Sequence, residues 1–137
     1  MTIFTADAAQ ASVQPKGTRV GLVAVRAVFS LNASLNAGDI VQMVKVPARA
    51  TPVYMQYGSN VTSTFLMFEI GDGISTGRYK SMSTYSAGQG MLAAIVASSP
   101  YVYSQDDTID INISVATLMS LNGALFMNVI FSMDATY

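Results

Sequence analysis

Two groups of acidic residues are the places in this 137-residue chain where spacing could support side-chain chemistry. Glu69, the sole glutamate, stands three positions before Asp72, and two carboxylates facing one cleft are what glycoside hydrolysis requires. Both residues fall at a predicted strand end, where nothing indicates a cleft. The bend Gly71-Asp72-Gly73 also lacks the lysine and the helix of a phosphate-binding loop. We therefore interpret this segment as a tight turn.

The second acidic group, Asp106 and Asp107 with Asp110, offers the oxygen ligands that a hard cation such as calcium prefers. A structural interpretation competes with it. Asp106 and Asp107 read as loop residues, and Asp110 falls on the polar face of an alternating strand, where solvated carboxylates need no metal. We favour the structural interpretation and expect no metal site.

The chain contains no histidine and no cysteine. Their absence removes hydrolytic triads, thiolate ligands and the commonest general base from consideration. We expect neither a cofactor nor an enzymatic activity.

Charge is scarce along the whole sequence. Charged residues make up 11% of the chain, seven basic and eight acidic, whereas 51% of the residues are hydrophobic. A typical soluble domain is about 25% charged. Charged side chains keep a monomer's surface solvated and free of partners, so the deficit predicts coverage by other subunits. No basic run could neutralise several phosphates in a row, which argues against nucleic acid as a partner.

The apolar content does not predict a membrane protein or an exported one. The longest apolar stretch, residues 124–131, is interrupted by Asn128 and is far shorter than the roughly 20 residues that a membrane-spanning helix needs. Residues 1–10 have no basic start and carry Asp7 where an apolar segment would run, so no secretory signal is expected. We expect a protein that works where it is made or assembled.

Short alternating segments separated by turn residues must position these side chains. Residues 20–31 are apolar on both faces, which predicts a strand covered on both sides. Residues 91–96 fit either a buried strand or two helical turns, and their isoleucine–valine end favours a strand. Further strands are expected at residues 40–46, 53–57, 64–70, 79–84 (a short edge strand), 108–117 (half-exposed) and 124–134.

Seven or eight short strands without a long helix predict an all-β fold, an antiparallel β-sandwich, and eight strands would suit a jelly roll. The length fits one domain, which we place at residues 19–137. Residues 1–18 mix small and polar types with Pro15 and Gly17, and we interpret them as an extended N-terminal arm. Within the arm, Ile3 and Phe4 could anchor to a neighbouring surface or could pack back onto their own domain.

Three segments resemble the head decoration (cement) proteins of tailed bacteriophages. They are AGDIVQMVKVPA at residues 37–48, IGDGISTGRY at residues 70–79 and YSQDDTIDI at residues 103–111, followed by a terminal apolar strand. The likeness spans roughly residues 20 to 134 and depends on the order and spacing of the segments. Residues 53–64 depart from the family's pattern, because they are more aromatic and less acidic.

The resemblance implies a jelly-roll protein, commonly trimeric, that sits on the outer surface of a phage head and braces subunits of the major capsid protein. It implies synthesis in the host cytoplasm and a structural role with no catalytic group, no cofactor, no nucleic acid and no membrane. Two arm residues and six basic residues are candidates for partner contacts: Ile3, Phe4, Arg19, Arg26, Lys45, Arg49, Arg78 and Lys80. Each basic residue could equally well solvate a strand edge.

Two other functions stay open at this point. A tail, fibre or spike component would share the sandwich and the charge deficit. A carbohydrate-binding module would need aromatic stacking platforms, which tyrosines could supply in a chain without tryptophan: Tyr54, Tyr57, Tyr79, Tyr85, Tyr101 and Tyr103.

Overall fold

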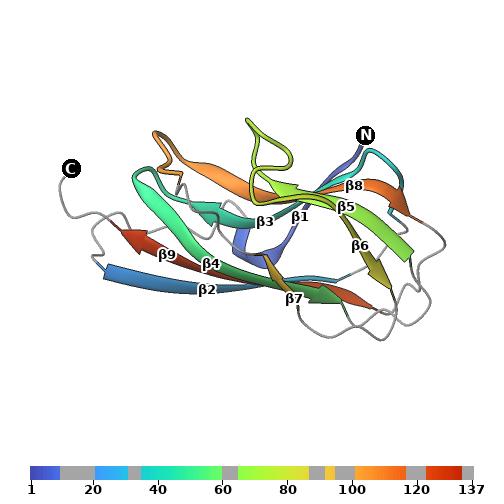
Figure 1. The fold of residues 1–137 in the computed structure, drawn as a ribbon, viewed down its shortest axis with the longest axis horizontal. Coiled ribbons are helices and arrows are strands. Elements are labelled where there is room, and N and C mark those ends of the chain that lie inside the picture. The colour runs from blue at the N-terminus through green and yellow to red at the C-terminus, as the bar shows by residue number, and fades with distance from the viewer. Residues whose placement is uncertain are drawn as a thin grey trace.

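Two stacked β-sheets form the described part of the molecule (Figure 1). The computed structural model describes residues 1–9, 21–30, 35–59, 65–86, 92–94, 101–116 and 123–133. The elements are β1 (Ile3–Thr5), the short 3-10 helix η1 (Asp7–Ala9), β2 (Gly21–Ser30), β3 (Ile40–Val46), β4 (Ala50–Ser59), β5 (Phe65–Gly71), β6 (Lys80–Ser86), β7 (Leu92–Ala94), β8 (Asp107–Ala116) and β9 (Ala124–Met133). Within these ranges, no helix has the length and apolar character needed to cross a membrane.

The strand pairing is that of a jelly roll. Strand β2 pairs with β9, β3 with β8, β4 with β7 and β5 with β6, always antiparallel. These nested pairs form one long ribbon that closes between β5 and β6. Two further pairs, β4 with β9 and β5 with β8, roll the ribbon into sheets of order β1-β3-β8-β5-β6 and β2-β9-β4-β7. The predicted all-β, jelly-roll-like sandwich is confirmed.

Alternation along the strands places the core between the two sheets. In β8, the isoleucines at 109, 111 and 113 are buried, and in β9 the inward positions are Leu125, Met127, Val129 and Phe131. Burying an apolar side chain of this size contributes about 1.5–3 kcal/mol. Because each strand supplies several such residues from one face, the core holds the two sheets together without any disulfide.

Most predicted strands appear where they were expected. Residues 40–46 form β3, the ambiguous segment 91–96 contains the strand β7, and β6 lies at a sheet edge. Strand β4 is longer than the predicted 53–57. A bulge between Pro52 and Tyr54 lets the proline, which has no amide hydrogen to donate, remain within the strand.

Strand β2 departs from its expectation. Its two apolar faces predicted cover on both sides, but β2 is an edge strand of the four-stranded sheet, and its outer face is open in the single chain. Leu22, on that outer face, keeps 72% of its surface exposed. The sequence pattern detects apolar side chains, but it does not distinguish cover by the same molecule from cover by another.

The first nine residues belong to the sandwich. Strand β1 adds to the five-stranded sheet by pairing in parallel with β3, which makes this sheet mixed and not purely antiparallel. The Asp7 carboxylate accepts a hydrogen bond from the Val28 amide at 2.8 Å and so ties this segment to the other sheet. The Phe4 ring packs against Phe29 with centroids 5.5 Å apart. Phe4 therefore packs back onto its own domain, whereas the Ile3 side chain on β1 is 53% exposed. Residues 10–18 of the predicted arm lie outside the described residues.

Candidate functional site

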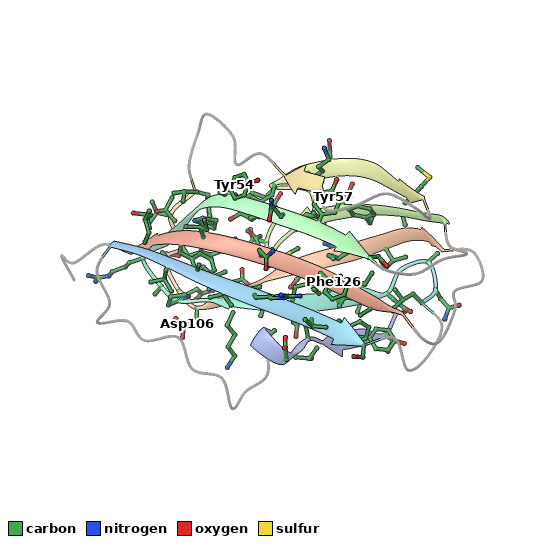
Figure 2. The ribbon with its side chains drawn as sticks, turned by 90° about the horizontal axis from the view of Figure 1, so that it is seen from below. Tyr54, Tyr57, Asp106 and Phe126 are labelled. Carbon is green, nitrogen blue, oxygen red and sulfur yellow. The ribbon has the colours of Figure 1, made fainter. Side chains whose placement is uncertain are left out.

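The outer face of the four-stranded sheet gathers apolar side chains that a single chain leaves open. Cross-strand pairing arranges its outward residues in four rows: Leu22, Ser132 and Thr51; Ala24, Ile130 and Tyr54; Arg26, Asn128 and Gln56; Val28, Phe126 and Gly58. We call this surface the β2–β9–β4 face, and Figure 2 looks onto it. Tyr54 is 40% exposed, and Val53 beside the bulge is 42% exposed. Such an apolar stripe along three adjacent strands is typical of a contact surface.

Arg26 is the one charged residue of the β2–β9–β4 face. Its guanidinium carbon lies 5.9 Å from the centroid of the Phe126 ring, so the cation rests over the aromatic face of the residue in the next row. Beside it, Asn128 donates a hydrogen bond to the Gln56 side chain at 3.5 Å. The centre of the face is therefore a small polar row with no carboxylate, bordered by apolar rows on both sides.

The outer face of the five-stranded sheet has the opposite character. Its outward positions on β3, β8 and β5 are mostly polar or charged: Gln42, Lys45, Asp110, Asn112, Ser114 and Glu69. One sheet thus presents mostly polar and charged side chains outward, whereas the other mixes apolar side chains with polar ones and carries a single charge, Arg26. We therefore take the β2–β9–β4 face as the candidate site.

A folded-back loop, residues 72–78, covers part of the polar sheet face. The Asp72 carboxylate, 1% exposed, accepts hydrogen bonds from the amides of Ile74 at 3.0 Å and Ser75 at 2.8 Å. The same carboxylate accepts hydrogen bonds from the Arg78 guanidinium at 2.5 Å and the Tyr103 hydroxyl at 2.9 Å. Burial alone would favour the neutral acid, but the Arg78 guanidinium and the amide and hydroxyl donors outweigh it and lower the pKa of Asp72.

Three tyrosines join Asp72 and Arg78 in a cluster that holds the 72–78 loop, and we call this cluster the clamp. The hydroxyls of Tyr79 and Tyr103 are hydrogen-bonded at 2.5 Å, and the Arg78 guanidinium stacks on Tyr101 with 3.6 Å from its carbon to the ring centroid. Burial raises the pKa of Tyr79 to about 12 and raises that of Tyr103 further, so both hydroxyls stay protonated. The cluster can hold a loop in place.

Gly71 allows the loop to approach the sheet closely. A Cβ atom at this position would collide with the backbone carbonyl groups of Ser75 and Thr76. We expect Gly71→Ala to lower the free energy of unfolding by about 1–3 kcal/mol in urea titrations, because backbone must move to admit the methyl group. Gly77→Ala is the matched control: its Cβ would meet the nearest atom at 3.5 Å, an ordinary contact. Equal effects of the two substitutions would contradict the close approach at Gly71.

Asp110 corrects a sequence-based expectation. The polar face of β8 predicted a solvated carboxylate, but Asp110 is 4% exposed. Its cross-strand neighbour on β5 is Gly71, the residue from which the 72–78 loop folds back. The Asn112 side chain, two positions further along β8, donates a hydrogen bond to the Thr76 carbonyl at 3.2 Å. The loop therefore covers this stretch of strand, and nothing in the alternation of β8 signals it.

The residues proposed from the sequence as partner contacts are scattered over the molecule. Arg26 lies on the β2–β9–β4 face, and Arg78 is held in the clamp by Asp72. The remaining candidates are Ile3, half-exposed on β1; Phe4, packed on Phe29; Lys45 on the polar face of β3; Arg49 in the turn before β4 with a φ of 71°; and Lys80 at the start of β6. Arg19 lies outside the described residues. The structure does not bring these residues together into one patch.

The alternatives raised for the acidic residues and the tyrosines can also be placed. Glu69 accepts a hydrogen bond from the Thr76 hydroxyl at 2.8 Å, and Asp106 accepts one from the Ala48 amide at 2.8 Å. Within the described ranges, no three acidic side chains are grouped so that they could hold a metal ion. Three of the tyrosines considered as stacking platforms are buried, namely Tyr57, Tyr79 and Tyr103. Buried rings cannot serve as stacking platforms, so three of the six tyrosines are not available to bind a sugar.

Comparison with known proteins places the fold among chains found in phage capsids. A chain in the capsid of Ralstonia phage GP4 superimposes with a TM-score of 0.79 and 17% sequence identity, over 97% of this chain and 99% of that one. A chain in the Cyanophage Pam1 capsid asymmetric unit gives a TM-score of 0.64 at 16% identity, over 93% and 97% of the two chains. A chain in the acidic stable capsid of Helicobacter pylori bacteriophage KHP30 gives 0.55 at 14% identity, over 84% and 89%.

No protein-family model matches the sequence, and no curated protein matches it. At these low identities the structural likeness establishes the fold alone. The chain shares an end-to-end jelly-roll fold with chains that occur in phage capsids.

Proposed function

We propose that this chain is a structural protein of a phage particle, a decoration or cement protein that attaches to the outside of the head and bridges coat subunits. The observation that carries the proposal is the end-to-end likeness, over 97% of this chain and 99% of the other, to a chain of a phage capsid. The alignment spans nearly the full length of both chains, so the likeness concerns the jelly roll as a whole and not an isolated part of it.

The β2–β9–β4 face supports the proposal and suggests how the protein associates. A capsid component needs apolar contact surfaces of fixed geometry and needs no catalytic group. We propose that this face is covered by a second copy of the chain. Association among copies would hide Leu22, Tyr54 and Ile130 from solvent as soon as the protein is made.

A ring of three copies fits this face better than a two-fold dimer. In a two-fold contact centred on the face, Arg26 of each copy would approach Arg26 of the other, and the face has no carboxylate to neutralise them. In a cyclic trimer, the face meets a different surface of its neighbour, so the two arginines stay apart. A homotrimer is therefore the oligomer that we propose.

Contact with the coat protein would then fall to other parts of the surface. We propose Lys45, Arg49 and Lys80, together with Arg19, as contacts to acidic groups of the major capsid protein. Ile3, which is 53% exposed on β1, is the apolar candidate beside them. Phe4 and Arg78 support these contacts indirectly, because the former holds β1 against β2 and the latter holds the 72–78 loop.

Co-sedimentation tests the proposed function. We expect the purified protein to pellet with phage heads that lack it and to saturate at a fixed ratio to coat subunits. Isolated tails serve as the control, because a tail, fibre or spike component would pellet with them and not with heads. Absence of saturable binding to heads would overturn the proposal.

A further inference from the structure

A buried carboxylate without a counter-charge lies beneath the 72–78 loop. Asp110 points to the outer side of the five-stranded sheet between Gln42 of β3 and Gly71 of β5, and only 4% of its surface is exposed. Its Oδ1 atom has no hydrogen-bond partner. Buried carboxylates elsewhere in the molecule are fully engaged, as Asp72 is, so Asp110 differs from them in a way that packing does not explain.

The charged groups around Asp110 do not neutralise it. On its own strand, Asp107 is negative and the Thr108 side chain donates a hydrogen bond to Asp110. From the loop, Asp72 is negative, and Arg78 is already paired with Asp72. Pairing places Lys45 of β3 opposite Thr108 and Glu69 of β5 opposite Asn112, so one cation and one further carboxylate share the face. With Asp72 paired to Arg78, the carboxylates of Asp107, Glu69 and Asp110 itself remain, and Lys45 is the one cation beside them on this face.

An ionised Asp110 would be a buried charge among like charges, which is strongly unfavourable. The neutral acid avoids that cost while the loop is closed. An ionised Asp110 would instead need water around it. The 72–78 loop can open to admit that water without disturbing the core, because the loop covers the outer side of the sheet. We propose that the 72–78 loop is a proton-controlled cover, closed over β5 and β8 while Asp110 carries its proton and opened when that proton leaves.

The pH range of the device follows from the surroundings of Asp110. Burial raises its pKa from 3.8 to about 7; the Thr108 hydrogen bond acts against this shift, and the charges of Asp107 and Asp72 act with it. Between pH 3.8 and about 7, Asp110 is therefore protonated in the closed state and ionised in the unfolded chain. Stability must fall as the pH rises from about 4 to about 7 and then level off. Each pKa unit corresponds to about a tenfold change in the unfolding equilibrium constant, so the upper limit is about a thousandfold.

Asp72 acts with the opposite sign in a separate range. Its pKa is lowered, so its contribution to stability is complete above pH 3.8 and is lost as the pH falls further. The two effects together predict greatest stability between about pH 4 and 5. Among the carboxylic acids of the described residues, Asp110 is the one whose raised pKa makes stability fall with rising pH, and this separation makes the proposal testable with one substitution.

Urea unfolding of the full chain between pH 4 and 8 tests the titration. For the wild type we expect the unfolding equilibrium constant to rise by about a hundredfold to a thousandfold over this range. Asp110→Asn keeps the shape of the neutral acid and should remove the rise. Asp106→Asn is the matched control: Asp106 is exposed, and removing its charge should leave the wild-type slope in place. A wild-type slope in Asp110→Asn would overturn the proposal.

Hydrogen exchange and carboxyl titration test the opening of the loop without relying on a variant. After correction for intrinsic exchange rates, the amides of Ile74 and Ser75, which donate to Asp72, should lose at least about tenfold of their protection between pH 5.5 and pH 8. The ¹³C shift of the Asp110 carboxyl should titrate over the same range. Unchanged protection, or a carboxyl that titrates near pH 4, would contradict the device even if Asp110→Asn fails to fold.

Discussion

Replacing Asp72 by alanine lowers the free energy of unfolding by about 3–5 kcal/mol, which is the expected result for removing one partner of a buried ion pair. The carboxylate is 1% exposed and accepts five hydrogen bonds, from Ile74, Ser75, Arg78 (two) and Tyr103, that join the 72–78 loop to Tyr103. Without it, the Arg78 guanidinium and the two loop amides lose their acceptor in a place that water reaches poorly. Urea unfolding at pH 6 measures the loss.

Tyr103→Phe provides the graded control for this prediction. It removes one hydroxyl from the same cluster and leaves the ion pair between Asp72 and Arg78 in place, so the expected cost is about 1 kcal/mol. A cost of Asp72→Ala that is no larger than that of Tyr103→Phe would mean that the clamp does not hold the loop. The comparison separates the ion pair from the hydrogen-bonded tyrosines.

We expect carboxylates placed on the β2–β9–β4 face to dissociate the proposed trimer into monomers. We expect the double variant Leu22→Asp and Tyr54→Asp to raise the dissociation constant of the oligomer by about a hundredfold or more, because two charges would have to be buried in the contact without partners. Both side chains are exposed in the single chain, 72% and 40%, so the fold should be retained. Sedimentation equilibrium measures the mass, and circular dichroism checks the fold.

Val102→Asp is the matched control for the face. Val102 is 57% exposed and apolar, but it lies in the segment before β8 and outside the β2–β9–β4 face. This variant should keep the oligomeric mass of the wild type. Dissociation caused equally by Val102→Asp would indicate a general effect of added charge, and an oligomer that survives Leu22→Asp with Tyr54→Asp would rule out the face as its contact.

The strands could be predicted from the sequence because their signals are local. Residues 40–46 are an apolar run with Gln42 as its polar exception, bounded by a turn before it and Pro47 after it, and they form β3 at those bounds. The sandwich follows from the number of such segments and from the lack of a long helix. Strand β1 could not be found in this way. A three-residue strand has no period to detect, and the pairing of Ile3 with Ile40 arises only once β3 is in place.

The sequence predicted a contact surface but not its position in the fold. The charge deficit predicted coverage by other subunits but not where it would occur, and the pairing of β2 with β9 and of β4 with β9 is needed to show that Leu22, Ile130 and Tyr54 share one face. The burial of Asp110 was missed because the loop that covers it comes from a distant part of the sequence. The signal available was Gly71, whose lack of a side chain permits the close approach.

The orientation of the protein on an assembled particle tests the central claim most directly. A cryo-electron microscopy reconstruction of phage heads carrying this chain would show which sheet face is covered. We predict jelly rolls on the outer surface of the shell, grouped in threes, with the β2–β9–β4 face buried against a neighbouring copy. Isolated copies with this face open to solvent, or heads that carry none of the protein, would contradict the account.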